Sequence, residues 1–139
     1  MDMMKVLIDS DVCLDSITGR YPYSIDADKL LTKVEERDVV GVVSSESFSN
    51  LYYVIRRLSS HKKAIEVLND LRKIVTIGTP MPEDVESALT SGWNDFDDAL
   101  QHFCALRENC DSIITRNKKD YMASELPVYS PSEWLDIHP

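Results

Sequence analysis

Short apolar runs alternate along this chain with longer stretches that have the 3.6-residue periodicity of helices. The runs occupy residues 6–8, 39–43, 74–77, 112–115 and 127–129. The first two contain no polar residue and are rich in Val, which is typical of strands buried on both faces of a sheet. The alternation predicts an α/β fold, with a central, mainly parallel sheet of about five strands flanked by helices. We expect residues 1–139 to form one such three-layer domain.

Net charge limits the kinds of partner that this chain can bind. The 139 residues are enough to bury a core, and the formal net charge is -9. This charge argues against a protein that binds nucleic acid through a broad basic surface. It does not exclude a site at which carboxylates hold divalent cations, because the ions reverse the local charge.

The three cysteines, Cys13, Cys104 and Cys110, form no Cys-x-x-Cys pair. Cys13 and Cys104 have apolar neighbours in the sequence, which predicts buried, reduced thiols. The first residues lack the charged-then-apolar pattern of a signal peptide, and no apolar run approaches membrane-spanning length. We therefore expect a cytoplasmic protein that makes no membrane contact.

An aspartate follows the first apolar run directly. Asp9 ends the run from Val6 to Ile8, and Ser10 and Asp11 are residue types that begin helices. The carboxylate is thereby placed at the carboxyl end of a central strand, where ligands bind in open α/β sheets. An Asp in this position often only caps the next helix, so the prediction depends on other carboxylates that reach the same edge.

Three further places put polar groups at strand ends or helix starts: Glu46, Asp98 and the turn from Asn117 to Asp120. Parallel strands would bring them together with Asp9. Converging carboxylates raise one another's pKa values, and a divalent cation relieves the repulsion. Oxygen ligands without His or Cys favour Mg²⁺ or Mn²⁺ over zinc. The chemistry that suits such a site is metal-assisted phosphodiester hydrolysis.

Several of these residues also have ordinary structural interpretations. Glu46 alone would complement the dipole of its helix. We expect Asp95 to cap the following helix, with Asp98 as its third residue and Asp97 in a dipole role. His102 lies four residues after Asp98 but has no second histidine nearby, so we expect a partly buried, hydrogen-bonded residue.

Four motifs follow one another between Lys5 and about Leu135. They are Asp-Ser-Asp after the first strand, Ser-Ser-Glu-Ser with a following Asn-x-Tyr-Tyr, Asp-Phe-Asp-Asp-Ala-Leu-Gln, and Ile-Ile-Thr-Arg-Asn-Lys-Lys-Asp-Tyr. In this order and spacing they resemble the PIN-domain family, most closely the bacterial toxins of the VapC type and their relatives. No single motif is specific, and the resemblance rests on the four together.

The resemblance implies a set of metal-binding positions. Asp9, Glu46 and Asp98 match the first three acidic positions of the family. The fourth acidic position falls on Asn117, which departs from the family pattern, since an amide oxygen can ligate but brings no charge. Asp120, one turn further on, is the alternative. The number of metal ions, one or two, is left open by this departure.

The resemblance also implies supporting residues. Ser10 stands where the family commonly has Thr, Asp11 where it commonly has Asn, and Thr115 matches the hydroxyl residue at the end of the fourth strand. We expect these three side chains to orient ligands or water. Arg116 and Arg57 are candidates for contacts with phosphates.

The function implied by the resemblance is that of a Mg²⁺- or Mn²⁺-dependent endoribonuclease, plausibly the toxin of a toxin–antitoxin pair. RNA, a cognate antitoxin and a second copy of the chain are then the expected partners. One alternative is a catalytically weak or inactive PIN-like module that binds RNA or protein, given Asn117. A more distant one is a haloacid-dehalogenase-like phosphatase with Asp9 as nucleophile, which leaves the segment from Thr115 to Asp120 unexplained.

Overall fold

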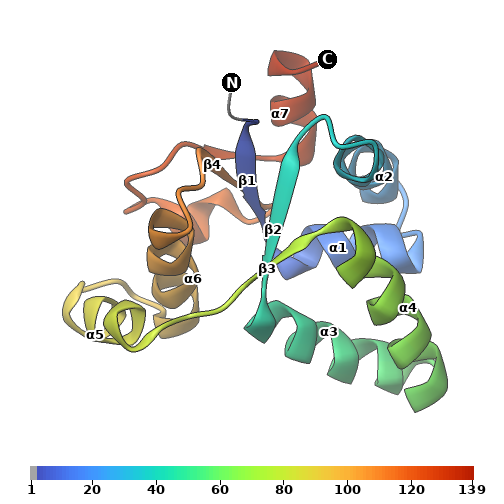
Figure 1. Ribbon diagram of the computed structural model, residues 1–139, viewed down its shortest axis with the longest axis horizontal. Helices are drawn as coiled ribbons and strands as arrows, with labels where there is room; N and C mark the ends of the chain where they lie inside the picture. The colour runs from blue at the N-terminus through green and yellow to red at the C-terminus, as the bar shows by residue number, and fades with distance from the viewer. Residues whose placement is uncertain (1–2) are drawn as a thin grey trace.

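A five-stranded parallel sheet forms the middle layer of the molecule (Figure 1). The structure is a computed structural model that describes residues 3–139. The strand order is β3-β2-β1-β4-β5, and all four neighbouring pairs are parallel. The strands are β1 (Lys5–Ile8), β2 (Val40–Ser44), β3 (Thr76–Gly78), β4 (Ser112–Ile114) and β5 (Val128–Tyr129). The predicted α/β class is confirmed, and the carboxyl ends of the strands share one edge.

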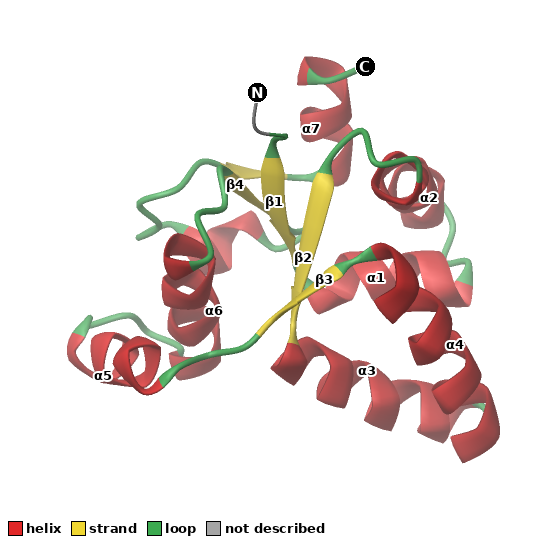
Figure 2. Cartoon of the chain, in the orientation of Figure 1, coloured by secondary structure: helices red, strands yellow, loops and turns green. Residues whose placement is uncertain are grey.

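Helices cover both faces of this sheet, which gives the predicted three layers (Figure 2). One face carries α1 (Ser10–Thr18), α2 (Tyr23–Glu35), α3 (Ser45–Leu58), α4 (His61–Ile74) and α7 (Pro131–Ile137). The other carries α6 (Phe96–Arg107), with α5 (Pro82–Thr90) packed beside it. A 3-10 helix, η1 (Lys118–Tyr121), follows β4. Each crossover from one parallel strand to the next is therefore a helical one.

The central strand, β1, is buried on both faces. Val6 and Ile8 pack into the core under α1 and α2, whereas Leu7 packs into the core under α6. At Gly41 in β2, an added Cβ would lie 2.9 Å from Ile8 Cδ1 and 3.0 Å from Val34 Cγ2. A glycine therefore allows α2 to pack closely against the sheet. This packing fixes the end of β1, and with it the position of Asp9.

The third strand lies further along the chain than we predicted. The sequence suggests a strand over residues 74–77, but Ile74 is the last residue of α4 and β3 is Thr76–Gly78. The Val75 backbone N–H still donates to Leu71 O at 3.2 Å, which closes the helix. Ile74 is apolar because it completes the buried stripe of a helix. An apolar run of this length does not distinguish the end of a buried helix from the start of a strand.

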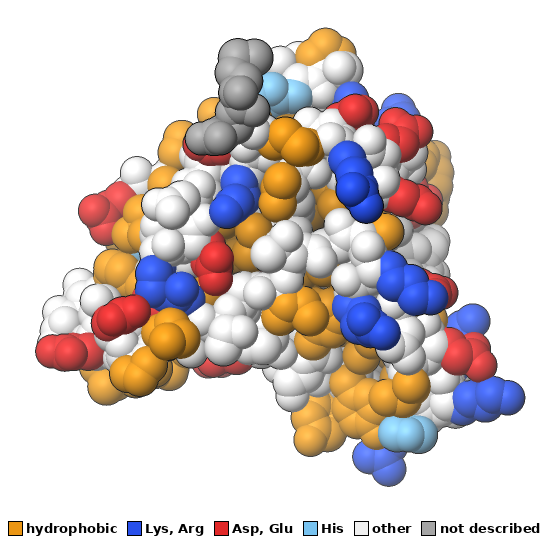
Figure 3. Space-filling model, viewed as in Figure 1, with side chains coloured by type: hydrophobic (Ala, Val, Ile, Leu, Met, Phe, Trp, Pro, Cys, Tyr) orange, Lys and Arg blue, Asp and Glu red, His pale blue; other side chains and the backbone are white. Residues whose placement is uncertain are grey.

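The three cysteines are free and buried, as expected for Cys13 and Cys104. Between residues 3 and 139, no helix combines the length and the apolar character that a membrane span requires. On the face seen in Figure 3, apolar side chains gather over the outer ends of α3 and α4. Large apolar residues that are exposed on these two helices include Tyr53, Leu58 and Ile65.

Candidate active site

Asp9 lies at the end of the central strand and caps α1. Its Oδ1 accepts hydrogen bonds from the Ser10 backbone N–H at 2.8 Å and from Gln101 Nε2 at 3.1 Å. Its Oδ2 accepts from Thr115 Oγ1 at 2.9 Å and from the Tyr121 hydroxyl at 3.3 Å. Asp9 therefore caps α1, and the cap uses only one of its four hydrogen bonds.

Glu46 reaches the same edge from the neighbouring strand. β2 ends at Ser44, whose hydroxyl accepts from the Ser47 backbone N–H at 3.1 Å and so caps α3. This cap places Glu46 in the first turn of α3, half-buried. Burial raises the pKa of Glu46, and the nearby charge of Asp97 raises it further. The residue therefore lies in a negatively charged environment.

Asp98 enters from the opposite layer, in the first turn of α6. Asp95 Oδ1 accepts from the Asp98 backbone N–H at 2.9 Å, so the predicted cap at Asp95 is confirmed. Burial, followed by the charges of Asp95, Asp120, Asp9 and Asp97, raises the pKa of Asp98 to about 7. Every charged neighbour that acts on this carboxylate is itself acidic.

The three carboxylates line one cavity of about 310 Å³ at the carboxyl edge of the sheet. Its lining consists of Asp9, Ser10, Glu46, Ser47, Asn50, Asp95, Asp97, Asp98, Gln101 and Asp120. Six of these residues are carboxylates, and neither Lys nor Arg is among the ten. We refer to this space as the carboxylate cavity. Its negative charge has no counterpart in the lining.

The donor set fits a hard divalent cation. Every polar group in the lining is an oxygen-bearing side chain, and carboxylate oxygens are the ligands that Mg²⁺ and Mn²⁺ prefer. In the positions shown, no group of three or more His, Cys, Asp or Glu side chains within residues 3–139 is close enough to hold a metal ion. The lining therefore offers suitable ligand types, and the carboxylate side chains would have to approach one another for one ion to contact three of them.

The residue at the fourth predicted position, Asn117, is not part of the cavity lining. Its Nδ2 donates to Asp11 Oδ2 at 3.0 Å, and its backbone N–H donates to Thr115 Oγ1 at 3.1 Å. The hydrogen bond to Asp11 turns the Asn117 side chain toward α1. Asp120 on η1 lines the cavity instead, so the two alternatives for this position occupy different places.

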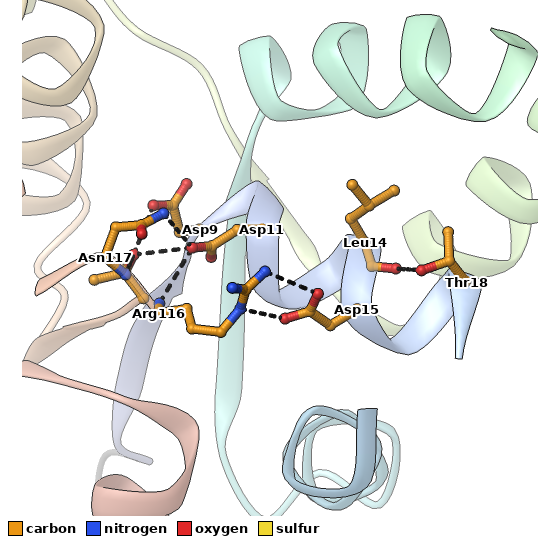
Figure 4. A network of polar contacts seen from close by, with 8 residues as sticks. Asp9, Asp11, Leu14, Asp15, Thr18, Arg116 and Asn117 are labelled. Carbon is orange, nitrogen blue, oxygen red and sulfur yellow. Dashed lines mark hydrogen bonds and ion pairs between the residues drawn. The ribbon is translucent and has the colours of Figure 1, made fainter. Parts of the chain in front are cut away.

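Asp11 fastens α1 to the loop after β4 (Figure 4). Besides Asn117, its Oδ2 accepts from the Arg116 backbone N–H at 3.2 Å and lies 3.4 Å from Thr115 Oγ1. Burial, with the charge of Asp9, raises the pKa of Asp11 to about 6. Thr115 contacts both Asp9 and Asp11, which is the arrangement we expect of a residue that orients carboxylates.

Arg116 is turned toward α1 rather than toward the cavity. Its Nε and Nη2 donate to the two carboxylate oxygens of Asp15, at 2.7 and 3.1 Å, as Figure 4 shows. The guanidinium also lies over the Tyr23 ring, 4.1 Å from its centre. Sequence reasoning did not select Asp15, which is buried on α1. The other candidate, Arg57, is exposed in the last turn of α3 and is outside the cavity lining.

Two residues of the site, Gln101 and Tyr121, were missed by sequence reasoning. Gln101 follows Asp98 by three residues on the same helix, a spacing that places both side chains on one face. His102 next to it is buried, and its Nε2 accepts from the Glu125 backbone N–H at 3.0 Å. Burial lowers the pKa of His102. The expectation of a hydrogen-bonded His is confirmed, although the side chain is more deeply buried than expected.

A parallel sheet of this order with an acidic cavity at its carboxyl edge defines an α/β protein with a candidate active site. Residues 5–119 match the family model of the PIN domain. The chain therefore belongs to the PIN domain family.

Named relatives and solved structures share nearly the whole fold. Ribonuclease VapC1 of Aquifex aeolicus (strain VF5) is 26% identical over 98% of this chain and 96% of its own length. The solved structure of VapBC-1 from nontypeable Haemophilus influenzae has a TM-score of 0.70 and 15% identity, and covers 93% of this chain and 99% of that one. VapC20 of Mycobacterium tuberculosis, a sarcin–ricin loop cleaving toxin, has a TM-score of 0.63 and 13% identity over 78% and 86% of the two chains.

Proposed function

We propose that this protein is a metal-dependent endoribonuclease that hydrolyses RNA phosphodiester bonds. The observation that carries the proposal is the carboxylate cavity, in which six acidic side chains have no Lys or Arg among them. Such a concentration of charge is costly unless a cation fills it. Membership of the PIN domain family and similarity to a relative named as a ribonuclease point to RNA as the substrate. The proposed unit is a single PIN-like domain, residues 1–139.

Asp9, Glu46 and Asp98 would hold a Mg²⁺ or Mn²⁺ ion, and Asp120 or Asn117 would complete the site. Such an ion supplies an activated water and offsets the charge that develops on the phosphoryl oxygens. Thr115 and the Ser10 backbone N–H keep the Asp9 carboxylate oriented. We assign Asp120 the stronger claim, because it lines the cavity.

Basic groups near the cavity would contact the RNA backbone. Lys119 lines a second cavity of about 230 Å³ that shares Asp95, Asp98 and Asp120 with the carboxylate cavity. It is therefore a better placed phosphate contact than Arg116, whose guanidinium is engaged by Asp15. Arg57 is retained as a contact for a longer substrate that extends along α3.

We further propose that the protein is the toxin of a toxin–antitoxin pair and forms a homodimer in the cytoplasm. Several solved structures with this fold are of VapBC proteins, including one from Haemophilus influenzae and one from Salmonella typhimurium bound to DNA. The exposed apolar residues of α3 and α4 would suit a protein partner. The free, buried cysteines suit a reducing compartment.

A second candidate is a PIN-like module that binds RNA or protein without cleaving it. The separation of the carboxylates and the position of Asn117 favour this candidate. Such a module need not bind Mn²⁺. The haloacid-dehalogenase-like alternative is not retained, because the family match covers residues 5–119 and includes the segment after β4 that this alternative left unexplained.

The experiment that tests the proposal is Mn²⁺-dependent cleavage of a mixed RNA pool by the wild type, beside Asp9→Asn. Loss of a charged ligand should abolish cleavage while the fold is kept. Asp38→Asn is the matched control, since Asp38 is exposed at the amino end of β2, far from the carboxylate edge. Cleavage that vanishes with chelator and with Asp9→Asn alone supports the proposal. A folded, Mn²⁺-treated wild type that cleaves nothing favours the binding module.

A further inference from the structure

Gln101 joins the ends of two strands at the base of the carboxylate cavity. Its Nε2 donates to Asp9 Oδ1 at 3.1 Å and to the Tyr121 hydroxyl at 3.0 Å. Its Oε1 accepts from the Ser44 hydroxyl at 2.9 Å and from the Ser47 hydroxyl at 3.2 Å. One side chain on α6 therefore contacts the residue after β1, the last residue of β2, the start of α3, and η1.

These contacts use the full hydrogen-bonding capacity of the amide. A primary amide has two N–H donors and an oxygen with two acceptor positions, and all four are engaged. The orientation is set by chemistry, because a carboxylate cannot donate and so must face the NH₂ group. Rotation of the amide by half a turn would place its oxygen against Asp9 Oδ1. Gln101 is thus held in one orientation.

Tyr121 reaches the same carboxylate from the other side. Its side chain is 2% exposed, and its hydroxyl accepts from Gln101 Nε2 while it donates to Asp9 Oδ2 at 3.3 Å. The hydroxyl is the donor in this contact, because a carboxylate oxygen can only accept. The ring packs in the core under α6, beside Trp93 at 6.0 Å between ring centres.

We propose that Gln101 and Tyr121 form a positioning clamp that holds the two oxygens of the Asp9 carboxylate in the orientation in which Asp9 serves the carboxylate cavity. Together with the Ser10 N–H and Thr115, the clamp engages each oxygen of Asp9 twice. The metal-binding part of this inference rests on the proposed function, whereas the clamp itself is a property of the metal-free protein.

The clamp can be observed directly because Gln101 is the only glutamine in the chain. Selective ¹⁵N-glutamine labelling gives one side-chain NH₂ group, with one proton directed at Asp9 and the other at Tyr121. We expect both proton resonances to be shifted and slow to exchange. Asp9→Asn and Tyr121→Phe should each move one of them strongly. Added Mg²⁺ should move the Asp9-directed proton, since the ion and the N–H bind the same carboxylate.

The consequence for metal binding is measured by titration of the full chain with Mn²⁺, followed by electron paramagnetic resonance. Tyr121→Phe removes one hydroxyl and keeps the ring, and should weaken Mn²⁺ binding about tenfold. Gln101→Met keeps the side-chain length and should weaken it by up to about 100-fold. Tyr52→Phe is the matched control, because its hydroxyl bonds to His61 Nδ1 at 2.8 Å, away from the cavity. In RNA cleavage, kcat should fall with little change in KM.

The outcomes separate the clamp from the proposed function. Weaker Mn²⁺ binding by both site variants, with the control unchanged, supports the clamp. A wild type that binds Mn²⁺ and variants that bind it equally well overturn the clamp while the proposed function stands. A wild type that binds no Mn²⁺ overturns the proposed function, and the amide spectrum of Asp9→Asn then decides the clamp alone. An unchanged spectrum would refute it.

Discussion

The two ends of helix α6 place carboxylates in opposite electrostatic environments. At its carboxyl end, Arg107 Nε donates to Asp84 Oδ2 at 2.9 Å, and Asp84 is 3% exposed. At its amino end, Asp98 has only acidic neighbours among the charges that act on its pKa. The first carboxylate is neutralised by the chain itself, whereas the second is not.

This difference separates the part of α6 that holds the fold together from the part that is available to a ligand. An ion pair between the buried Asp84 and the partly exposed Arg107 joins α5 to α6 and neutralises the buried carboxylate. Unpaired carboxylates lower the stability of the metal-free protein and favour any cation that enters. Mutation at the amino end is therefore expected to raise the stability of the metal-free protein and weaken cation binding. Mutation at the carboxyl end is expected to lower the stability and leave binding unchanged.

The largest expected effect is at Asp98. Asp98→Asn removes one charge from the carboxylate cavity, so Mn²⁺-dependent RNA cleavage should fall by more than about 100-fold, beyond the usual cost of a residue that only supports a ligand. The same variant should melt at a higher temperature than the wild type in chelator, because repulsion is relieved. Activity assays check the predicted loss of cleavage, and thermal melts in chelator check the predicted rise in melting temperature. Full activity of Asp98→Asn, or a lower melting temperature, would contradict the distinction between the two ends of α6.

The next effect is at Asp84. Asp84→Ala leaves Arg107 without its closest carboxylate partner, and it removes the acceptor of a 2.8 Å hydrogen bond from the Met81 backbone N–H. We expect a loss of about 2–3 kcal/mol in the free energy of unfolding, measured with urea. Cleavage per folded molecule should be unchanged. A loss of activity without a loss of stability would show that this ion pair also shapes the carboxylate cavity.

The smallest effect is a pH dependence of the metal-free protein. The pKa of Asp98 is raised to about 7 in the folded state, above its ordinary value of 3.8. A raised folded pKa stabilises the protein at low pH, and this contribution is lost as the pH rises toward 7. In chelator, the melting temperature should therefore fall between about pH 4 and pH 7 more in the wild type than in Asp98→Asn. Parallel curves would contradict this.

The same proton also competes with a cation. Because Asp98 must lose it to bind Mn²⁺ as a carboxylate, the affinity for Mn²⁺ should rise with pH and level off above about 7. A titration at several pH values checks this. An affinity that does not change between pH 5 and pH 7 would show that Asp98 is not a ligand.

The sequence was informative where a local pattern decides the outcome. The apolar run before Asp9 predicts a buried central strand, and Asp95 three residues before Asp98 predicts a helix cap. Both features involve residues close together in the chain. Convergence of Asp9, Glu46 and Asp98 on one cavity followed from the single further assumption that the strands are parallel.

The features that the sequence did not reveal depend on distant partners. Gln101 bonds to a residue 92 positions away, and Tyr121 to one 112 positions away. Apart from the three-residue spacing between Asp98 and Gln101, nothing in their sequence neighbourhoods distinguishes these two residues from an exposed glutamine and a core tyrosine. Asn117 turns toward Asp11 for the same reason, since its partner lies on another element. The hydrogen-bond partners of these side chains are set by tertiary packing, which the periodicity of the sequence does not reveal.

The contacts between the start of α1 and the segment after β4 have a mechanical consequence. Hydrogen bonds join Asp9 to Thr115 and Tyr121, and join Asp11 to Asn117. A further one joins Asp15 to Arg116. The wall of the cavity that carries Asp9 and Asp120 is thus braced as one block. Glu46 and Asp98 sit on the first turns of two separate helices, bridged through Gln101. Because Gln101 joins both helices to each other and to Asp9, we expect an entering ligand to be accommodated by rotation of the Glu46 and Asp98 side chains, with little movement of the helices that carry them.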